Sequence, residues 1–204
     1  GIRRGGRARA GIGWGRCRRP AVGALGGGGQ ADAELALVGV LGVGARVPPH
    51  KEVPEDPGVE HRLAMCRLVA DAEPWLEVSD LETRRPGPSY TITTLREIDA
   101  RQPGDELTLI VGGDMALSLP TWHEPAAILE LAELAVAERA GMPRSAVLAE
   151  VGRVAGGEHV RFLDMPRLDV SSSEVRQSIR DGRRIRDLVP QTVADYIEER
   201  RLYV

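Results

Sequence analysis

The sequence predicts an α/β protein built on a mostly parallel β-sheet with helices on both faces. Two observations support this fold class. The 204 residues, of which 42% are hydrophobic and 28% charged, suffice for a globular domain with a real core. Apolar segments of strand length alternate with segments of helical spacing from about residue 34 onward. Such alternation is typical of parallel sheets whose strands are connected by helices.

Five strands are expected. Residues 35–43 (LALVGVLGV) form an apolar run of strand length, and residues 106–113 (ELTLIVGG) indicate a buried strand. Shorter strands are expected around 75–78, at 133–138 and at 159–163. Ligands of such sheets bind beyond the carboxyl ends of the strands, so the residues that follow these segments are the candidates for chemistry.

Helices separate these strands. Residues 60–72 show helical spacing through Leu63, Cys66 and Val69. The C-terminal segment PQTVADYIEERRLY is amphipathic and has Pro190 at its start, where proline is favoured. Four further helices are expected at 91–100, 124–132, 143–155 and 171–181.

Residues 1–45 form an atypical Gly/Arg-rich segment ahead of a domain that we place at 46–204. The segment holds 14 of the 24 glycines and seven arginines against only Asp32 and Glu34. Glycine at this density makes ordering costly in backbone entropy, and no clean helical or strand period precedes about Ala33. A basic arm, a transit peptide and a phosphate loop each lack part of their signature. We interpret the segment as poorly ordered or as translated in a shifted reading frame.

Composition and charge exclude several classes of protein. No apolar run approaches the roughly 20 residues that a membrane-spanning helix needs. A net charge of -3 argues against a general nucleic-acid binder, which needs a basic surface. Cys17 and Cys66 are too few for a disulfide framework or a cysteine-based zinc site, and the four histidines are scattered. We expect a cytoplasmic protein that binds neither nucleic acid nor membrane and holds no metal of its own.

The loop VPPHKE at residues 47–52 follows the first credible strand. Pro48 and Pro49 stiffen the loop and present His50 and Lys51 as hydrogen-bond donors. Lys51 is the only lysine in the chain, and its retention favours a compact point charge beside a phosphate. The alternative is a plain proline-rich turn with a solvated lysine.

The stretch RRPGPSYTITTL at residues 84–95 places hydroxyl groups beside free amides. Its proline-glycine turn leads to Tyr90 and to a helix that begins near Thr91. Amides at this helix start can hold a carboxylate or a phosphate. A capped helix without a ligand is the alternative.

The stretch GGDMALSLPTWHEP at residues 112–125 follows the most strand-like segment. Gly112 and Gly113 let a ligand approach the backbone, and Asp114 can accept hydrogen bonds from ribose hydroxyls. Trp122 offers a flat face to an aromatic ring. Asp114 as a simple N-cap and Trp122 as a core residue are the alternatives.

The stretch LDVSSSEVRQSIRDGR at residues 168–183 contains a helix start. Ser171 and Glu174 have capping-box spacing, which predicts that the helix begins at Ser172. Hydroxyls, free amides and Arg176 one turn on form a cradle suited to polyphosphate. A capping box taken alone indicates only a helix start.

Together and in this order, these stretches closely resemble the bacterial nicotinate mononucleotide adenylyltransferases of the nucleotidylyltransferase superfamily, from about residue 46 onward. The resemblance is carried by VPPHKE, EHRLAMCRL, EVSDLETRRPGPSYTITTL, ELTLIVGGDMALSLPTW, DVSSSEVR and LVPQTVADYIEERRLY. It implies a Rossmann-like sheet of the nucleotidylyltransferase fold. It also implies a reaction that joins nicotinate mononucleotide to ATP with Mg²⁺ and gives deamido-NAD and pyrophosphate, a step of NAD biosynthesis.

The resemblance also implies two sets of site residues. The phosphates of ATP are expected at the residues that match the family signature ISSTxIR: Ser171, Ser172, Ser173 and Arg176. Nicotinate mononucleotide is expected at His50, Lys51, Tyr90, Thr91, Gly112, Asp114 and Trp122. Within this second set, Tyr90, Thr91 and Trp122 match the positions that hold the nicotinate ring.

The chain departs from the family pattern at its start. The family opens with a strand followed by GTFDPxHxGH or a close variant, whose two histidines meet the ATP phosphates. This chain has no histidine before His50, so its catalytic residues stay unassigned. Residues 1–45 have about the length of that strand, loop and helix. A frameshift upstream of roughly Arg46 explains the length, the composition and the return of the family pattern in one step.

The resemblance implies an enzyme that transfers an adenylyl group by direct in-line attack, and a sequence without a nucleophile–base pair agrees with that mechanism. Two alternatives stay open. One is an adenylyltransferase for another phosphorylated acceptor, such as phosphopantetheine. The other is a nucleotide-binding homologue without catalysis. The sequence leaves the oligomeric state open, and a homodimer is one of the states that it allows.

Overall fold

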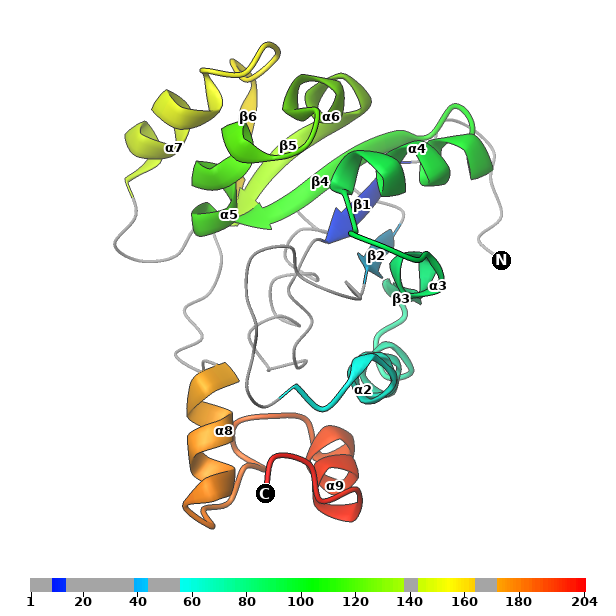
Figure 1. Ribbon diagram of the computed structural model, residues 1–204, viewed down its shortest axis with the longest axis vertical. Helices are drawn as coiled ribbons and strands as arrows, with labels where there is room; N and C mark the ends of the chain where they lie inside the picture. The colour runs from blue at the N-terminus through cyan, green and yellow to red at the C-terminus, as the bar shows by residue number, and fades with distance from the viewer. Residues whose placement is uncertain (1–8, 14–38, 44–55, 138–142, 164–171) are drawn as a thin grey trace.

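Six parallel strands form a single sheet in the part of the chain that the computed structural model describes, residues 9–13, 39–43, 56–137, 143–163 and 172–204. For 9–13, 39–43 and residues 172 and 173 the backbone alone is described. The strands are β1 (Arg9–Gly13), β2 (Gly39–Val43), β3 (Leu76–Ser79), β4 (Glu106–Gly112), β5 (Ala132–Ala137) and β6 (Val160–Leu163). Their order in the sheet is β3-β2-β1-β4-β5-β6 (Figure 1). The predicted parallel α/β class is confirmed.

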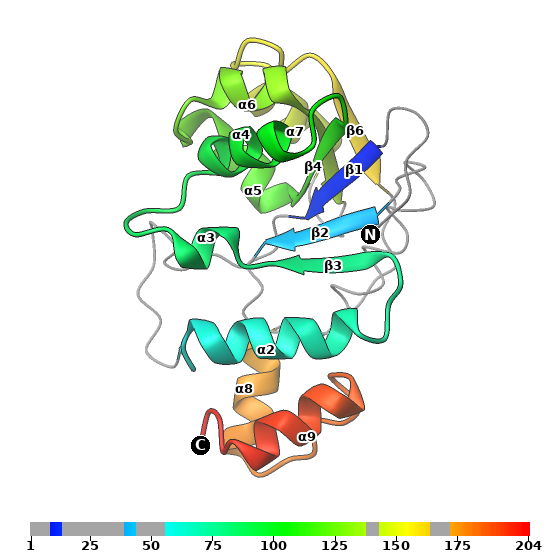
Figure 2. The same cartoon turned by 90° about the vertical axis from the view of Figure 1, so that its right-hand side faces the viewer.

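Helices cover the sheet from two sides. Helices α4 to α7 lie on one side, and α2, α8 and α9 lie on the other (Figures 1 and 2). The bounds are α2 (Val59–Ala70), α3 (Leu81–Arg84), α4 (Thr91–Arg101), α5 (Gly113–Ser118), the 3₁₀ turn η1 (Leu119–Thr121), α6 (Pro125–Leu131), α7 (Arg144–Val151), α8 (Ser172–Arg180) and α9 (Gln191–Glu199). None of these helices is long and apolar enough to cross a membrane.

Most elements occur where the sequence predicts them. Strand β4 and helix α4 agree with the predicted ranges to within one residue, and β2 occupies the last five residues of the predicted 35–43 strand. Helices α3 and α5 and the turn η1 were not predicted. With three to six residues each, they are too short to show a helical period in the sequence.

Strand β1 contradicts the expectation that no strand precedes about Ala33. It pairs in parallel with β2 on one side and with β4 on the other, at the centre of the sheet. Glycine disfavours a strand interior, so Gly11 and Gly13 hid this element from the sequence analysis. Pairing on both sides supplies the backbone hydrogen bonds that the local sequence does not encode. The domain boundary between residues 45 and 46 stays a prediction.

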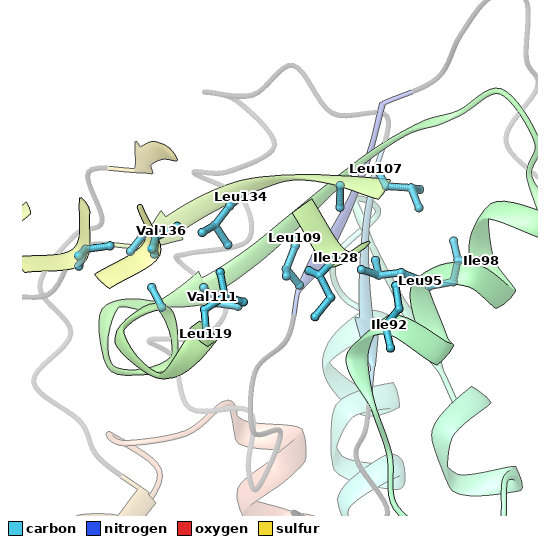
Figure 3. Packing of buried hydrophobic residues seen from close by; sticks show 14 of the residues in the cluster. Ile92, Leu95, Ile98, Leu107, Leu109, Val111, Leu119, Ile128, Leu134 and Val136 are labelled. Carbon is cyan, nitrogen blue, oxygen red and sulfur yellow. The ribbon is translucent and has the colours of Figure 1, made fainter. Parts of the chain in front are cut away.

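The first core cluster lies between β4, β5 and the helices α4 to α7 (Figure 3). Alternate residues of β4 and residues three apart on α4 enter it, which is why these segments show periods of two and of 3.6 in the sequence. Its largest fully buried side chains are Ile92, Leu95, Leu109, Leu119, Ile128 and Leu134. This cluster fixes α4 and α5 against the sheet.

A second core cluster joins α2, α8 and α9. Met65 of α2, Val175 of α8 and Val193 of α9 are all fully buried in it. Leu76 of β3 packs against the same cluster. The C-terminal helices are therefore anchored on α2 and on the β3 edge of the sheet.

Candidate functional site

The described candidate residues around Tyr90 and Trp122 lie on the segments that follow strands β3 and β4. Strand β3 is followed by α3, a turn and the start of α4, and β4 is followed by α5, η1 and Trp122. Because all strands run parallel, both segments leave the sheet at the same edge. The predicted residues His50, Lys51 and Ser171 lie outside the described residues.

Helix α4 begins at Thr91, as predicted, and Tyr90 is its N-cap residue. The backbone amides of Thr93 and Thr94 donate to the Tyr90 carbonyl, at 3.1 and 3.3 Å. Tyr90 makes no side-chain cap hydrogen bond, so the helix start is not capped in the way that the alternative interpretation required. The Tyr90 side chain is 41% exposed and Thr91 is half-buried. This end of α4 therefore offers backbone donors and an aromatic ring to the site.

The residues after β4 leave open space beside the backbone. A Cβ added to Gly112 would meet no atom within 4 Å, which agrees with the predicted close approach of a ligand. Asp114 lies exposed in the first turn of α5, whereas the N-cap position belongs to Gly112. The alternative that Asp114 is a simple N-cap is therefore wrong. Its carboxylate lies near the positive end of the short helix, where negative charge is favoured.

Trp122 is half-buried and combines both interpretations of its role. One part of the indole packs against the first core cluster. Its Nε1 donates to Oγ of Ser118 at 3.0 Å, and that hydroxyl in turn donates to the Met115 carbonyl at 2.8 Å. The hydrogen bond fixes the plane of the indole, and the exposed remainder of the ring stays accessible to a ligand.

Two contacts bring the Trp122 loop onto the start of α4. The rings of Tyr90 and His123 lie with centroids 4.5 Å apart and planes inclined by 36°. The Arg96 guanidinium donates to both carboxylate oxygens of Glu124, at 3.1 and 2.7 Å. This hydrogen bonding from Arg96 holds the pKa of the Glu124 carboxyl below its usual range. The two stretches predicted to hold the nicotinate ring are therefore adjacent in the structure.

The backbone of the loop is strained at Glu124. Its φ of 50° lies in the left-handed region, which a residue with a Cβ rarely adopts. The two-pronged hydrogen bond from Arg96 opposes relaxation of this strain. Strained backbone of this kind persists where the surroundings over-determine it, often beside a functional site.

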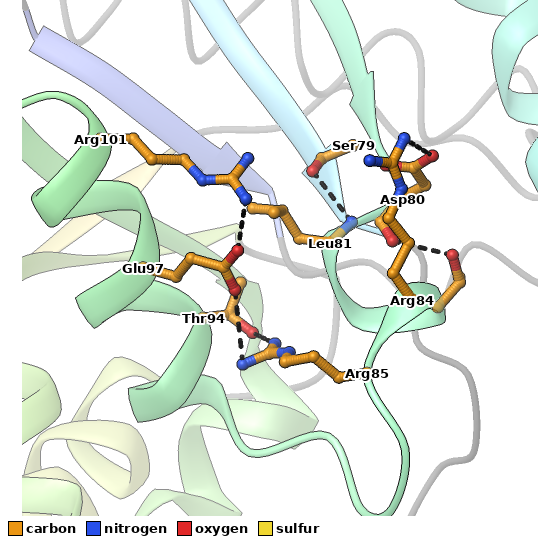
Figure 4. A network of polar contacts seen from close by, with 9 residues as sticks. Ser79, Asp80, Leu81, Arg84, Arg85, Thr94, Glu97 and Arg101 are labelled. Carbon is orange, nitrogen blue, oxygen red and sulfur yellow. Dashed lines mark hydrogen bonds and ion pairs between the residues drawn. The ribbon is translucent and has the colours of Figure 1, made fainter.

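A buried carboxylate, that of Glu82 in α3, lies beneath the turn that precedes α4. Thr94 donates its hydroxyl to Glu82 Oε1 at 2.8 Å, and both side chains are fully buried. Arg85 donates to the same hydroxyl of Thr94 and forms an ion pair with Glu97 at 3.8 Å (Figure 4). Burial raises the pKa of Glu82, while the Thr94 hydroxyl, Arg85 and Ser89 oppose the shift. The turn at residues 86–90 is thus bounded at both ends by one polar network.

Helix α8 begins at Ser172, as predicted, and continues to Arg180. The side chains of Ser172 and Ser173 lie outside the described residues, and Arg176 is half-buried. Val175 anchors the helix in the second core cluster. Arg176 therefore stands on a helix that is anchored in a different core cluster from the one that Trp122 contacts.

The sequence did not indicate the side chains that make these contacts, among them Glu82, Arg96 and His123. Glu82 and Arg96 stand in charged stretches that resemble solvated helix faces, and their contacts depend on tertiary packing. His123 directly follows Trp122, and this adjacency is the one signal that pointed to it.

Comparison with known proteins gives a family and close relatives. The chain matches the cytidylyltransferase-like family over residues 30–178. It is 40% identical over 185 residues to a probable nicotinate-nucleotide adenylyltransferase of Geobacter metallireducens, covering 83% of this chain and 86% of that protein. It is 39% identical over 180 residues to the protein of the same name from Symbiobacterium thermophilum, covering 85% of this chain and 86% of the relative.

Solved structures share the fold. The nicotinic acid mononucleotide adenylyltransferase of Plasmodium falciparum, complexed with NaAD, superimposes with a TM-score of 0.76 at 17% identity over 97% of both chains. A second structure of that enzyme, complexed with APC, gives a TM-score of 0.75 at 16% identity, over 97% of this chain and 98% of the other. The predicted nucleotidylyltransferase fold is confirmed.

Proposed function

Because the chain belongs to the cytidylyltransferase-like family, with nicotinate-nucleotide adenylyltransferases among its relatives, we propose that it transfers the adenylyl group of ATP to nicotinate mononucleotide. The products are deamido-NAD and pyrophosphate, which places the reaction in NAD biosynthesis. Identity of about 40% over most of both chains is the observation that carries this proposal. The contact between Tyr90 and His123 supports it, since it brings together the two stretches predicted to hold the nicotinate ring.

The reaction is a single in-line displacement. An oxygen of the 5′-phosphate of nicotinate mononucleotide attacks the α-phosphorus of ATP. The new phosphorus–oxygen bond forms as the bond to the β-phosphate oxygen breaks, and pyrophosphate leaves with the electron pair. Such a step requires alignment of the two phosphates and neutralisation of their charge more than proton transfer.

The two substrates use different parts of the molecule in this proposal. The nicotinate ring lies at the start of α4, against the exposed part of Trp122 and the amides that follow Tyr90. The ATP phosphates lie at the start of α8, where Arg176 can supply a planar, permanently charged fork. Gly112 ends β4 and Asp114 lies in the first turn of α5, and both are proposed acceptor contacts together with His50 and Lys51.

Magnesium enters as the ion of the ATP substrate in this proposal. Within the described ranges no group of three or more His, Cys, Asp or Glu residues is arranged to hold a metal. Mg²⁺ commonly binds through nucleotide phosphates and water with only one or two protein carboxylates, so such a group is not required.

The cytoplasmic location is likewise proposed, on the grounds of the low cysteine content and the buried thiol of Cys66.

The test is the formation of products from defined substrates. Purified protein is incubated with ATP and Mg²⁺ and either nicotinate mononucleotide or phosphopantetheine, and pyrophosphate and the adenylylated product are measured. Calorimetric titration with each nucleotide separately reports binding where turnover is slow. Binding of nicotinate mononucleotide with formation of deamido-NAD supports the proposal. Turnover of phosphopantetheine alone, or ATP binding without any acceptor binding, overturns it.

A further inference from the structure

We propose that Glu82, Thr94 and Arg85 form a positioning network that sets the turn at residues 86–90 and the start of α4 for the acceptor nucleotide. None of the three is assigned a contact with substrate. They act through the backbone around Tyr90. This inference rests on the proposed function, because it concerns the acceptor side of the same site.

The network closes the turn at both ends. Arg85 immediately precedes the turn, and Thr94 lies in the first turn of the helix that follows it. Arg85 donates to the Thr94 hydroxyl, and that hydroxyl donates to Glu82 Oε1 at 2.8 Å. One hydroxyl group therefore connects a cation on one side of the turn to a buried anion beneath it.

The turn itself has little other support. Pro86, Gly87 and Pro88 are all exposed, so core packing does not fix their positions. Gly87 adopts a φ of +86°, a conformation that glycine accepts readily, and it leaves the turn conformationally permissive. The position of Tyr90 therefore depends on how the ends of the turn are held.

Thr94 transmits the constraint to Tyr90. Its backbone amide donates to the Tyr90 carbonyl at 3.3 Å while its side chain is fixed by the buried carboxylate. The Tyr90 ring contacts His123, which follows Trp122. A shift of Thr94 thus moves the helix-start amides relative to the indole that faces the same ligand.

Packing alone does not explain a buried carboxylate, because removing a charged group from water costs free energy. Glu82 is fully buried, and its Oε2 accepts no hydrogen bond from the described residues. An apolar side chain of similar volume usually gives equal or greater stability at such a position. Buried polar networks do fix one arrangement out of several near-equivalent ones, and that is the property an acceptor site requires.

The experiment compares three substitutions on the full chain by calorimetry with nicotinate mononucleotide and with ATP. T94V keeps the shape of the side chain but removes its hydroxyl, and T94S keeps the hydroxyl. T93V makes the same change at an exposed position of the same helix and serves as the control. T94V should weaken nicotinate mononucleotide about tenfold, equivalent to about 1.4 kcal/mol, and leave ATP affinity unchanged. T94S and T93V should bind both nucleotides like the wild type.

R85Q provides a second route should T94V fail to fold, since Arg85 is only half-buried. It should weaken nicotinate mononucleotide severalfold and spare ATP. Unchanged nicotinate mononucleotide affinity in T94V or R85Q, or an equal loss of affinity for both nucleotides, overturns the inference. Either result would mean that the network serves only the stability of the fold. A wild-type chain that binds no nicotinate mononucleotide refutes the proposed function itself, and the inference with it.

Discussion

The ring of Tyr90 rests against that of His123, with centroids 4.5 Å apart, and this contact joins two segments that leave the sheet after different strands. Tyr90 follows β3 and α3, whereas His123 follows β4 and α5. The ion pair between Arg96 and Glu124 makes a second connection nearly two helical turns further along α4. The proposed acceptor side of the site thus draws on both segments, and changes in either segment should affect binding of the same ligand.

Replacing Trp122 with alanine should weaken nicotinate mononucleotide more than ATP. Stacking on an aromatic side chain contributes about 1 to 3 kcal/mol per ring, which corresponds to about 5- to 150-fold in affinity. W122F is the matched control, because it keeps an aromatic face while losing the hydrogen bond to Ser118. Calorimetry with both nucleotides checks the result, alongside thermal unfolding, since the indole also packs on the core. Equal losses for both ligands would show that Trp122 serves the core alone.

Replacing Arg176 with lysine should lower ATP affinity severalfold and leave nicotinate mononucleotide unaffected. Lysine keeps the charge but loses the planar fork that binds two phosphate oxygens at once. R180K is the control, because Arg180 is an exposed arginine one turn further on the same helix. Unchanged ATP affinity in R176K would leave α8 as a structural helix only.

Glu82 should make stability depend on pH in a direction opposite to that of most carboxylates. Burial raises its pKa above the ordinary 4.5, so the folded state binds the proton more readily than the unfolded chain. Its contribution is fully present below pH 4.5 and is lost as the pH rises through the raised pKa. The side chain of E82Q does not titrate. The melting temperature of E82Q minus that of the wild type should therefore increase as the pH rises across this window.

Thermal unfolding of both proteins at a series of pH values from 4.5 to 8 measures that difference. E82K is unsuitable as a comparison because it replaces the buried carboxylate with a buried ammonium group, which titrates as well. A difference that stays constant, or that falls with rising pH, would mean that the Glu82 carboxyl is not destabilised by burial.

Restoring a GTFDPxHxGH segment ahead of Arg46 should raise the rate of adenylyl transfer from near zero by a factor of at least about 100, because removal of a single transition-state charge stabiliser typically costs about 100 to 1,000. The given chain lacks both histidines of that motif. Pyrophosphate release from ATP and nicotinate mononucleotide is the readout, and the restored chain with both histidines changed to alanine is the control. Robust synthesis by the unmodified chain would mean that residues 1–45 supply phosphate contacts of another kind. The nucleotide sequence of the gene tests the frameshift separately, through the presence of HxGH in an alternative frame.

The elements with strong periods were predictable and the short ones were not. Helix α4 and strand β4 have apolar residues at the spacing that their burial requires, so their sequences alone indicate their state. Strand β1 has no such pattern, because pairing with β2 and β4 imposes its conformation from outside. Likewise the residue type of Trp122 makes it a candidate from sequence alone, whereas the contact of Glu82 with Thr94 depends on the packing of α3 against α4, which no local pattern encodes.

Strand β1 joins the two halves of the sheet. Within the sheet, β1 alone connects the pair β3-β2 to the run β4-β5-β6. Trp122 packs against the first core cluster, and Arg176 stands on a helix anchored in the second. In-line displacement tolerates little error in the distance between attacking oxygen and phosphorus. In the proposed reaction the alignment of the two half-sites therefore depends on a strand of five residues, two of which are glycine.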